Sequence, residues 1–447
     1  MTNNKLLYSY WDIFRVSVPI MLGLLAQTIV QLTATFFLGR VGGVEQGAVG
    51  LAGIYYIVCF TICFGFSIGA QIMISRRNGE QNYNKIGTIV IQGLAFLLMI
   101  ALVLFGISTF VVKNVLPGVL NSPEVSAAVD TYLSWRIFGF FFSSLNVMFR
   151  AFYVGIARTP VLTINAIVMG VVNFFFDYVL IFGNWGFPEM GVAGAGIAAV
   201  LSEISSVLFF FIYTFITVDL KKYGFARMRF KFSIIKNILS ISSFTMIQYL
   251  VSMSTWFIFF IAIEKQSQQA LEITNIVRNF YMIFFIPMNA FATTANTLVG
   301  NTMGAGRFKE VIPLIKRICM LSVGVIAVVM TVTAISPQFW ISFIAPVDDP
   351  TITPLSVAPL LVVVAVLPIC SLSTVVFNSI SGTGNTKAAL ILEICTLVLY
   401  IIYMYFVVIR AQAPVAVCWT VEYIYWGFLL LFSAIYLKRA KWQTKVI

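Results

Sequence analysis

The sequence predicts an all-α polytopic membrane protein, with twelve transmembrane helices in two parallel six-helix repeats around a central cleft. The composition is the first reason: 60% of the 447 residues are hydrophobic and only 10% are charged, whereas soluble proteins carry roughly 25% charged residues. The second reason is that the apolar residues form separate runs long enough to cross a bilayer. The third is that segments in the two halves of the chain are similar to each other.

Twelve apolar runs are each about 20 residues or longer, the length that a helix needs to cross the hydrocarbon core of a bilayer. The first run follows a polar start and lacks a small-residue cleavage site, so we interpret it as an uncleaved first span and not as a signal peptide. The predicted spans are 13–38, 48–75, 86–112, 126–149, 161–183, 191–217, 234–262, 270–300, 313–336, 353–381, 388–409 and 415–437.

The distribution of Lys and Arg predicts the orientation. If both termini are cytoplasmic, 22 of the 28 Lys and Arg residues fall in cytoplasmic segments and four in outer loops, while Arg136 and Arg278 lie inside spans. Cytoplasmic loops carry an excess of Lys and Arg, so this ratio favours cytoplasmic termini. It also accounts for the net charge of +12 without a nucleic-acid partner.

The two halves resemble each other at corresponding helix ends. Phe64–Asn82 aligns with Asn289–Arg307, and Tyr153–Thr163 aligns with Gly382–Leu392. Six spans per half make the repeats parallel, an arrangement that membrane transporters often use. We therefore predict an N-lobe at 1–218, a basic cytoplasmic linker at 219–233 and a C-lobe at 234–447.

One acid lies in the middle of the fifth span. Asn173 and Asp177 are four residues apart in "VVNFFFDYVLIFGNWGFP", so they share one face of a helix. A carboxylate is costly in an apolar environment, and the aligned positions of the second half are Ile402 and Phe406. The pair predicts a site for a proton or Na⁺; the alternative is a structural, hydrogen-bonded acid near the outer end of the span.

Other charges inside the spans are candidates for the lining of a substrate cavity. Glu272 and Arg278 are six residues apart and so do not share a helix face, while Asn275 lies midway and bridges toward either. Glu393 either lines the cavity or pairs with Lys387. Four further charges complete the set. Glu203 and Glu422 are weaker candidates of the same kind as Glu393, and Asp130 and Arg136 are predicted to be interface or structural charges.

Several other features limit the class of protein. No histidine is present, and the six cysteines lie at no metal-ligand spacing, so we expect neither a metal centre nor a cofactor. No nucleophile–base set or nucleotide-binding loop is visible. The glycines of "GVAGAG" predict tight packing of the sixth span, because no strand precedes them. The chain is therefore expected to be a transporter and not an enzyme.

At four segments the chain resembles the multidrug and toxic compound extrusion (MATE) family. These segments are "FFLGRVGG", "VGIARTP", "SGTGNTK" and "NFFFDYVLIFGNWGFPEMGVAGAGIAA". The resemblance implies an antiporter that exports cationic or amphipathic organic compounds by alternating access, using an inward H⁺ or Na⁺ gradient. It further implies a monomer in the bacterial cytoplasmic (inner) membrane, whose partners are the substrate and the lipid bilayer.

The resemblance also bears on the ion-coupling residues. Asn173 and Asp177 are similar to the acid pair of the DinF-type branch, and Gln27 is similar to a polar residue of the first span in that site. Ala34 stands where the family often has an aspartate, and the acids that the NorM-type branch carries in spans seven and ten are missing. The alternative function is a lipid-linked oligosaccharide flippase of the same wider superfamily.

Overall fold

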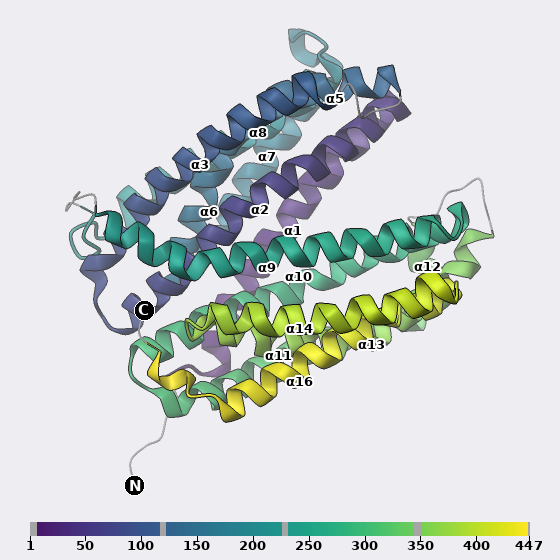
Figure 1. Cartoon of the computed structure of the whole chain (residues 1–447). Helices are drawn as coiled ribbons and strands as arrows, with labels where there is room; N and C mark the ends of the chain where they lie inside the picture. The colour runs from purple at the N-terminus through teal and green to yellow at the C-terminus, as the bar shows by residue number, and fades with distance from the viewer. Residues whose placement is uncertain (1–6, 117–121, 226–230, 344–350, 446–447) are drawn as a thin grey trace. The chain divides into compact units, whose positions relative to one another are not determined.

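The computed structural model describes residues 7–116, 122–225, 231–343 and 351–445, and within these ranges it contains helices and no strand (Figure 1). Eleven helices are long and apolar enough to cross a membrane, and one bent pair completes twelve spans. The predicted fold class is therefore confirmed. The basic linker predicted at 219–233 is described only in part, since 226–230 lie outside these ranges.

The described part of the first half contains seven α-helices and two short 3₁₀ turns. Their bounds are α1 (Tyr10–Val41), α2 (Gly43–Gly79), η1 (Tyr83–Lys85), α3 (Ile86–Asn114), α5 (Pro123–Arg136), α6 (Gly139–Gly155), α7 (Pro160–Phe182) and α8 (Gly191–Thr217), with η2 (Asn184–Gly186) between the last two.

The second half repeats long helices with more interruptions. The bounds are α9 (Phe232–Glu264), α10 (Gln268–Gly304), η3 (Phe308–Glu310), α11 (Val311–Ile335), α12 (Pro337–Ser342), α13 (Ile352–Gly382), α14 (Thr386–Met404), η4 (Tyr405–Arg410), α15 (Val415–Cys418), α16 (Val421–Arg439) and η5 (Trp442–Thr444).

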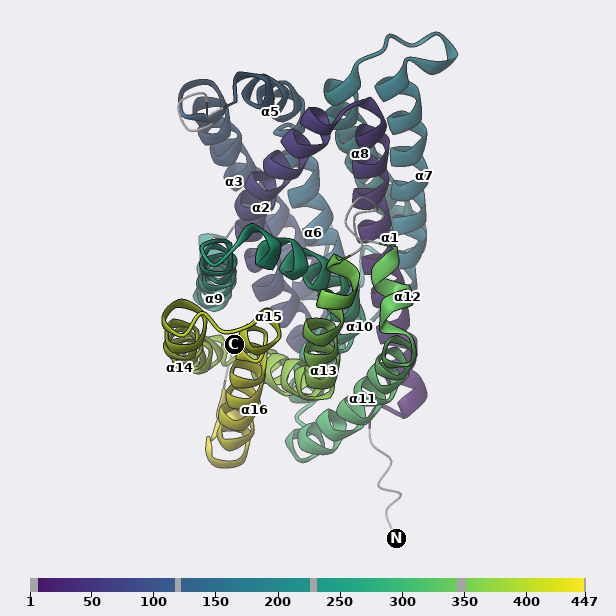
Figure 2. The ribbon, with the colours of Figure 1, turned by 90° about the vertical axis from the view of Figure 1, so that its right-hand side faces the viewer.

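The chain forms two compact units. Val18–Met246 makes up one, here called the N-terminal unit, and Met1–Ser17 together with Ile247–Ile447 makes up the other, the C-terminal unit. In the N-terminal unit α2 packs against α5 and α6, and α7 packs against α8. In the C-terminal unit α13 packs against α10, α11 and α16, and α14 packs against α16 (Figures 1 and 2).

The fourth predicted span, 126–149, is not one straight helix. It consists of α5 and α6, which meet at an angle of 53°. At the bend the backbone changes to shorter-range hydrogen bonds, from Phe140 N to Ile137 O and from Phe141 N to Phe138 O. Gly139 begins α6, and glycine is a common cause of a sharp kink.

The glycines of the sixth span permit close helix packing, as the sequence predicts. A Cβ atom at Gly194 would lie 2.7 Å from the carbonyl carbon of Leu180 on α7, and one at Gly196 would lie 2.9 Å from the carbonyl oxygen of Tyr132 on α5. Small residues let helix backbones approach closely in a membrane. They bring α8 against the two helices that carry the polar residues described next.

Candidate functional site

The acid pair of α7 is buried in the N-terminal unit. Asn173 is 1% exposed and Asp177 is 0% exposed. Within the described part of the chain, neither carboxylate oxygen of Asp177 has a hydrogen-bond partner, and neither does Oδ1 of Asn173. The alternative of a hydrogen-bonded structural acid is therefore not what the structure shows. A charged carboxylate in this state is strongly destabilising, and the role of the pair in binding a proton or Na⁺ stays a prediction.

Tyr132 connects this acid to a second charged pair. It is buried on α5 and lies within electrostatic range of both Asp177 and Arg136. Arg136 is one turn further along α5. The bare acid of α7 and the guanidinium of α5 thus face one buried tyrosine.

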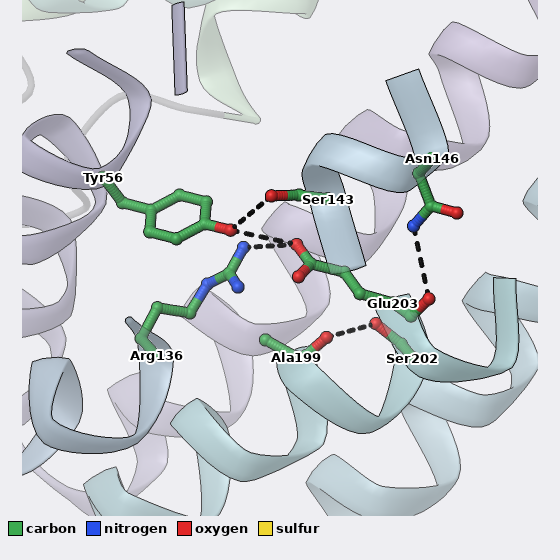
Figure 3. A network of polar contacts seen from close by, with 7 residues as sticks. All are labelled: Tyr56, Arg136, Ser143, Asn146, Ala199, Ser202 and Glu203. Carbon is green, nitrogen blue, oxygen red and sulfur yellow. Dashed lines mark hydrogen bonds and ion pairs between the residues drawn. The ribbon is translucent and has the colours of Figure 1, made fainter. Parts of the chain in front are cut away.

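Arg136 and Glu203 form a buried ion pair. Nη2 of Arg136 lies 2.7 Å from Oε1 of Glu203, and their side chains are 12% and 7% exposed (Figure 3). The guanidinium also lies over the ring of Tyr56, 3.6 Å from its centroid. Of the two alternatives predicted for Arg136, an interface charge or a structural charge, this buried ion pair agrees with the structural one.

Neutral polar groups complete this pair. The hydroxyl of Tyr56 donates to Oε1 of Glu203 at 3.4 Å and lies 3.0 Å from Oγ of Ser143. Asn146 donates from Nδ2 to the backbone carbonyl of Glu203 at 3.2 Å (Figure 3). A Cβ atom at Gly139 would overlap the Arg136 guanidinium, so glycine at the bend leaves the space that the ion pair fills.

The polar chain extends from α6 through α8 to α7. Oγ of Ser206 lies 2.8 Å from Oδ1 of Asn146 and 2.9 Å from Oδ1 of Asn165. Asn165 is on the same helix as Asp177. A displacement of α7 would therefore be felt by the residues that hold Glu203.

The structure does not bring Gln27 to the acid pair. Its side chain on α1 is exposed, and the described residues show no hydrogen bond between it and Asn173 or Asp177. Ala34 is half-buried on the same helix. The ion-coupling role of Gln27 stays a prediction.

The predicted cavity residues of α10 have different surroundings. Glu272 is half-buried and accepts from Nε2 of Gln268 at 3.4 Å. Arg278 is half-buried, and its guanidinium lies 5.4 Å from the ring centroid of Phe260 on α9. Asn275 is half-buried and has no hydrogen bond to either among the described residues. Their contact with substrate stays a prediction.

Glu393 is buried on α14 and does not pair with Lys387. Its Oε1 accepts hydrogen bonds of 2.6 Å from Oγ of Ser252 and from the hydroxyl of Tyr425, whereas Lys387 is exposed. The pairing alternative therefore fails. Six residues separate the two, which puts them on different faces of the helix.

The aromatic and hydroxyl partners of these acids could not be identified from the sequence. These partners stand among many other apolar and aromatic residues, and nothing in their spacing distinguishes them. They are Tyr56, Ser252, Tyr281, Tyr425 and Trp426. One signal was available for Arg136 and Glu203: opposite charges inside spans usually pair with each other.

The comparisons with known proteins agree with this architecture. The family model MatE matches residues 19–179 and 242–406. The "Probable multidrug resistance protein NorM" of Thermotoga maritima is 25% identical over 390 residues, which is 85% of this chain and 82% of that protein. The "Probable multidrug resistance protein YoeA" of Bacillus subtilis is 29% identical over 206 residues, 44% of this chain and 42% of that protein.

Solved structures share the fold. An outward-facing multidrug resistance MATE family transporter of the MOP superfamily superposes with a TM-score of 0.87 at 17% identity, covering 98% of this chain and 97% of that chain. The Vibrio cholerae MATE transporter VcmN gives a TM-score of 0.84 at 17% identity, covering 98% of both chains. At these identities the likeness concerns the fold alone.

Proposed function

Because the chain belongs to the MatE family, whose members are membrane transporters and not enzymes, we propose that it is a secondary active antiporter that exports cationic or amphipathic organic compounds. The driving force is an inward H⁺ or Na⁺ gradient, and the transport is by alternating access. Relatives named as multidrug resistance proteins support the substrate class and favour an exporter over the flippase. We further propose that the antiporter is a monomer in the bacterial cytoplasmic membrane, with both termini cytoplasmic.

The observation that carries the proposal is the bare carboxylate of Asp177. Both of its oxygens are buried without a partner among the described residues, and the unpartnered Oδ1 of Asn173 lies on the same helix face. Asn and Asp oxygens suit a small hard cation, and a proton alone neutralises the acid. This pair is similar to that of the DinF-type branch, so we place the coupling site in the N-terminal unit.

Coupling follows if the two states of the transporter differ in affinity for the ion. A ligand shifts a conformational equilibrium only by its differential affinity for the two states. With Asp177 charged and buried, the described arrangement is destabilised, and binding of the ion removes this cost. Ion entry thus favours the arrangement of α7 described here, while ion loss favours a state in which Asp177 meets water.

The test is transport in everted membrane vesicles that contain the full chain. Ethidium accumulation is measured under an imposed H⁺ gradient and, separately, under an imposed Na⁺ gradient. Asp177→Asn is expected to lose the response to the coupling gradient, and the gradient that drives the wild type identifies the ion. Asp130→Asn is the matched control, because Asp130 is exposed on α5 in the same unit.

Two results would contradict the proposal. Equal ethidium accumulation by wild type and Asp177→Asn under both gradients would remove Asp177 from the coupling mechanism. Translocation of a labelled lipid-linked sugar without any ethidium transport would replace the exporter by the flippase.

A further inference from the structure

A second set of buried acids lies in the C-terminal unit, on α14 and α16. Glu393 is 1% exposed and Glu422 is 3% exposed. Glu422 accepts at Oε2 from the hydroxyl of Tyr281 at 2.7 Å and from Nε1 of Trp426 at 2.9 Å. Tyr425, which donates to Glu393, lies within electrostatic range of both carboxylates. The two acids therefore belong to one cluster.

In the described part of the chain no Lys or Arg compensates these acids. Among the described residues, neither glutamate forms an ion pair with Lys or Arg. The groups that face them are Ser252 from α9, Tyr281 from α10, Cys370 from α13, Tyr400 from α14, and Tyr425 and Trp426 from α16. All of these are uncharged. The cluster thus differs from the N-terminal unit, where Arg136 compensates Glu203.

Two polar atoms of the cluster are left without partners. Oε2 of Glu393 and the hydroxyl of Tyr400 are both buried and make no hydrogen bond among the described residues. Tyr400 is 3% exposed. Its ring centroid is 6.0 Å from that of Tyr425, and its hydroxyl lies within electrostatic range of Glu422. Leaving such a group unpaired costs about 1–3 kcal/mol, and at Oε2 of Glu393 a bound proton would remove this cost.

We propose that Glu393 and Glu422 form a second proton-binding site of the transport cycle, in which the pair gains and loses one proton at Oε2 of Glu393. The inference rests on the proposed function, since only an ion-driven transporter uses such a site. The proton adds to Oε2 from water and returns to water, and no other bond changes.

The chemistry of the cluster favours a proton over Na⁺. A Na⁺ ion needs several free oxygen ligands, but Oε1 of Glu393 already accepts two hydroxyl protons. Trp426 offers an N–H donor, which cannot bind a cation through nitrogen. A proton needs only the free Oε2. Once it is bound, Oε1 is the carbonyl oxygen and keeps both hydrogen bonds.

The experiment is infrared difference spectroscopy of the full chain reconstituted in lipid nanodiscs, between about pH 5 and about pH 9. The wild type is expected to show a C=O band of a protonated carboxylic acid that disappears as the pH rises. The band is expected to be absent in Glu393→Gln/Glu422→Gln and to remain in Glu264→Gln, since Glu264 is an exposed acid of the same unit.

A second variant keeps the test decisive if the double variant does not fold. Tyr425→Phe keeps the ring and removes one hydrogen bond to the Glu393 carbonyl, so it is expected to move the band to higher frequency. A band that is unchanged in Tyr425→Phe, or one that persists in a folded double variant, would overturn the proposal. A titration that shifts when choline is replaced by Na⁺ would show a sodium site and would also overturn it.

The same spectra separate this inference from the proposed function. Asp177→Asn is expected to remove only the contribution of Asp177 and to leave the Glu393 band. If Asp177→Asn transports like the wild type while the Glu393 band behaves as expected, the coupling role of Asp177 fails and the second site stands. If Asp177→Asn loses transport but no band responds to the two glutamates, only the second site fails.

Discussion

The buried pair of Arg136 and Glu203 allows a quantitative prediction about stability. Glu203→Gln keeps the shape of the side chain but leaves the guanidinium buried without a counter-charge. Breaking a buried pair in this way costs about 3–5 kcal/mol. The contact of Arg136 with Tyr56 is present in the wild type too, so it does not change this difference. A loss of about 3 kcal/mol lowers the unfolding midpoint of a unit of this size by about 6–12 °C.

The assay uses a buried thiol of the same unit. Cys63 is buried on α2, so a thiol-reactive fluorescent dye labels it only when the unit opens. Thermal scans at one fixed rate, in a background with the other cysteines replaced, give an apparent midpoint for each variant. The fixed rate matters because unfolding of such a protein is expected to be irreversible.

Two further variants decide what the midpoint means. Glu80→Gln breaks a more exposed pair of equal length, 2.7 Å to Arg77, together with a contact of 3.8 Å to Arg76. Pairs near the surface contribute only about 0.2–1 kcal/mol. Arg136→Met/Glu203→Met removes both buried charges and is expected to recover most of the loss. A midpoint for Glu203→Gln within about 2 °C of the wild type, or a double variant as unstable as the single one, would refute this reasoning.

Two other expectations follow from packing and from charge distribution. Gly194→Ala places a Cβ 2.7 Å from the Leu180 carbonyl carbon, so we expect it to lower stability by about 1–3 kcal/mol in the same thermal assay. Gly106→Ala, whose Cβ would have no atom within 4 Å, is expected to be neutral or to gain about 0.5–1 kcal/mol of stability. Equal behaviour of the two variants would contradict close packing at Gly194. For orientation, a membrane-impermeant thiol reagent is expected to label Lys309→Cys only in everted vesicles and Glu189→Cys only in right-side-out vesicles, and the reverse pattern would invert the topology.

Much of the fold could be predicted because the membrane imposes a simple rule. Each span needs a long apolar run, and twelve such runs are visible in the sequence. The bend between α5 and α6 could not be predicted in the same way. Its glycine stands in an apolar run that a straight helix would also tolerate. Gly139 leaves space for the pairing of Arg136 with Glu203, and these two partners are 67 residues apart in the sequence.

For the candidate sites too, local contacts could be predicted and contacts between distant helices could not. The spacing of Asn173 and Asp177 put both on one face of α7, and local helix geometry was enough for that prediction. The partners of Glu393 come from α9 and α16, 141 and 32 residues away in the sequence. No helical periodicity relates residues so far apart. The sequence therefore offered only Lys387, a nearby cation that the helix turns away from the acid.

The buried acids do not follow the repeat, and this bears on why they are present. Helix ends and glycine turns recur in both halves, yet Asp177 aligns with Phe406, and Glu393 aligns with Ile164 at the same offset. A charge required by the architecture would be expected in both halves. The N-terminal unit compensates Glu203 with a guanidinium and leaves Asp177 bare, whereas the C-terminal unit surrounds both acids with uncharged donors. Unpaired buried charge is costly in either unit. The proposed ion at Asp177 and the proposed proton at Glu393 would remove this cost, and each half would then carry its own change of charge.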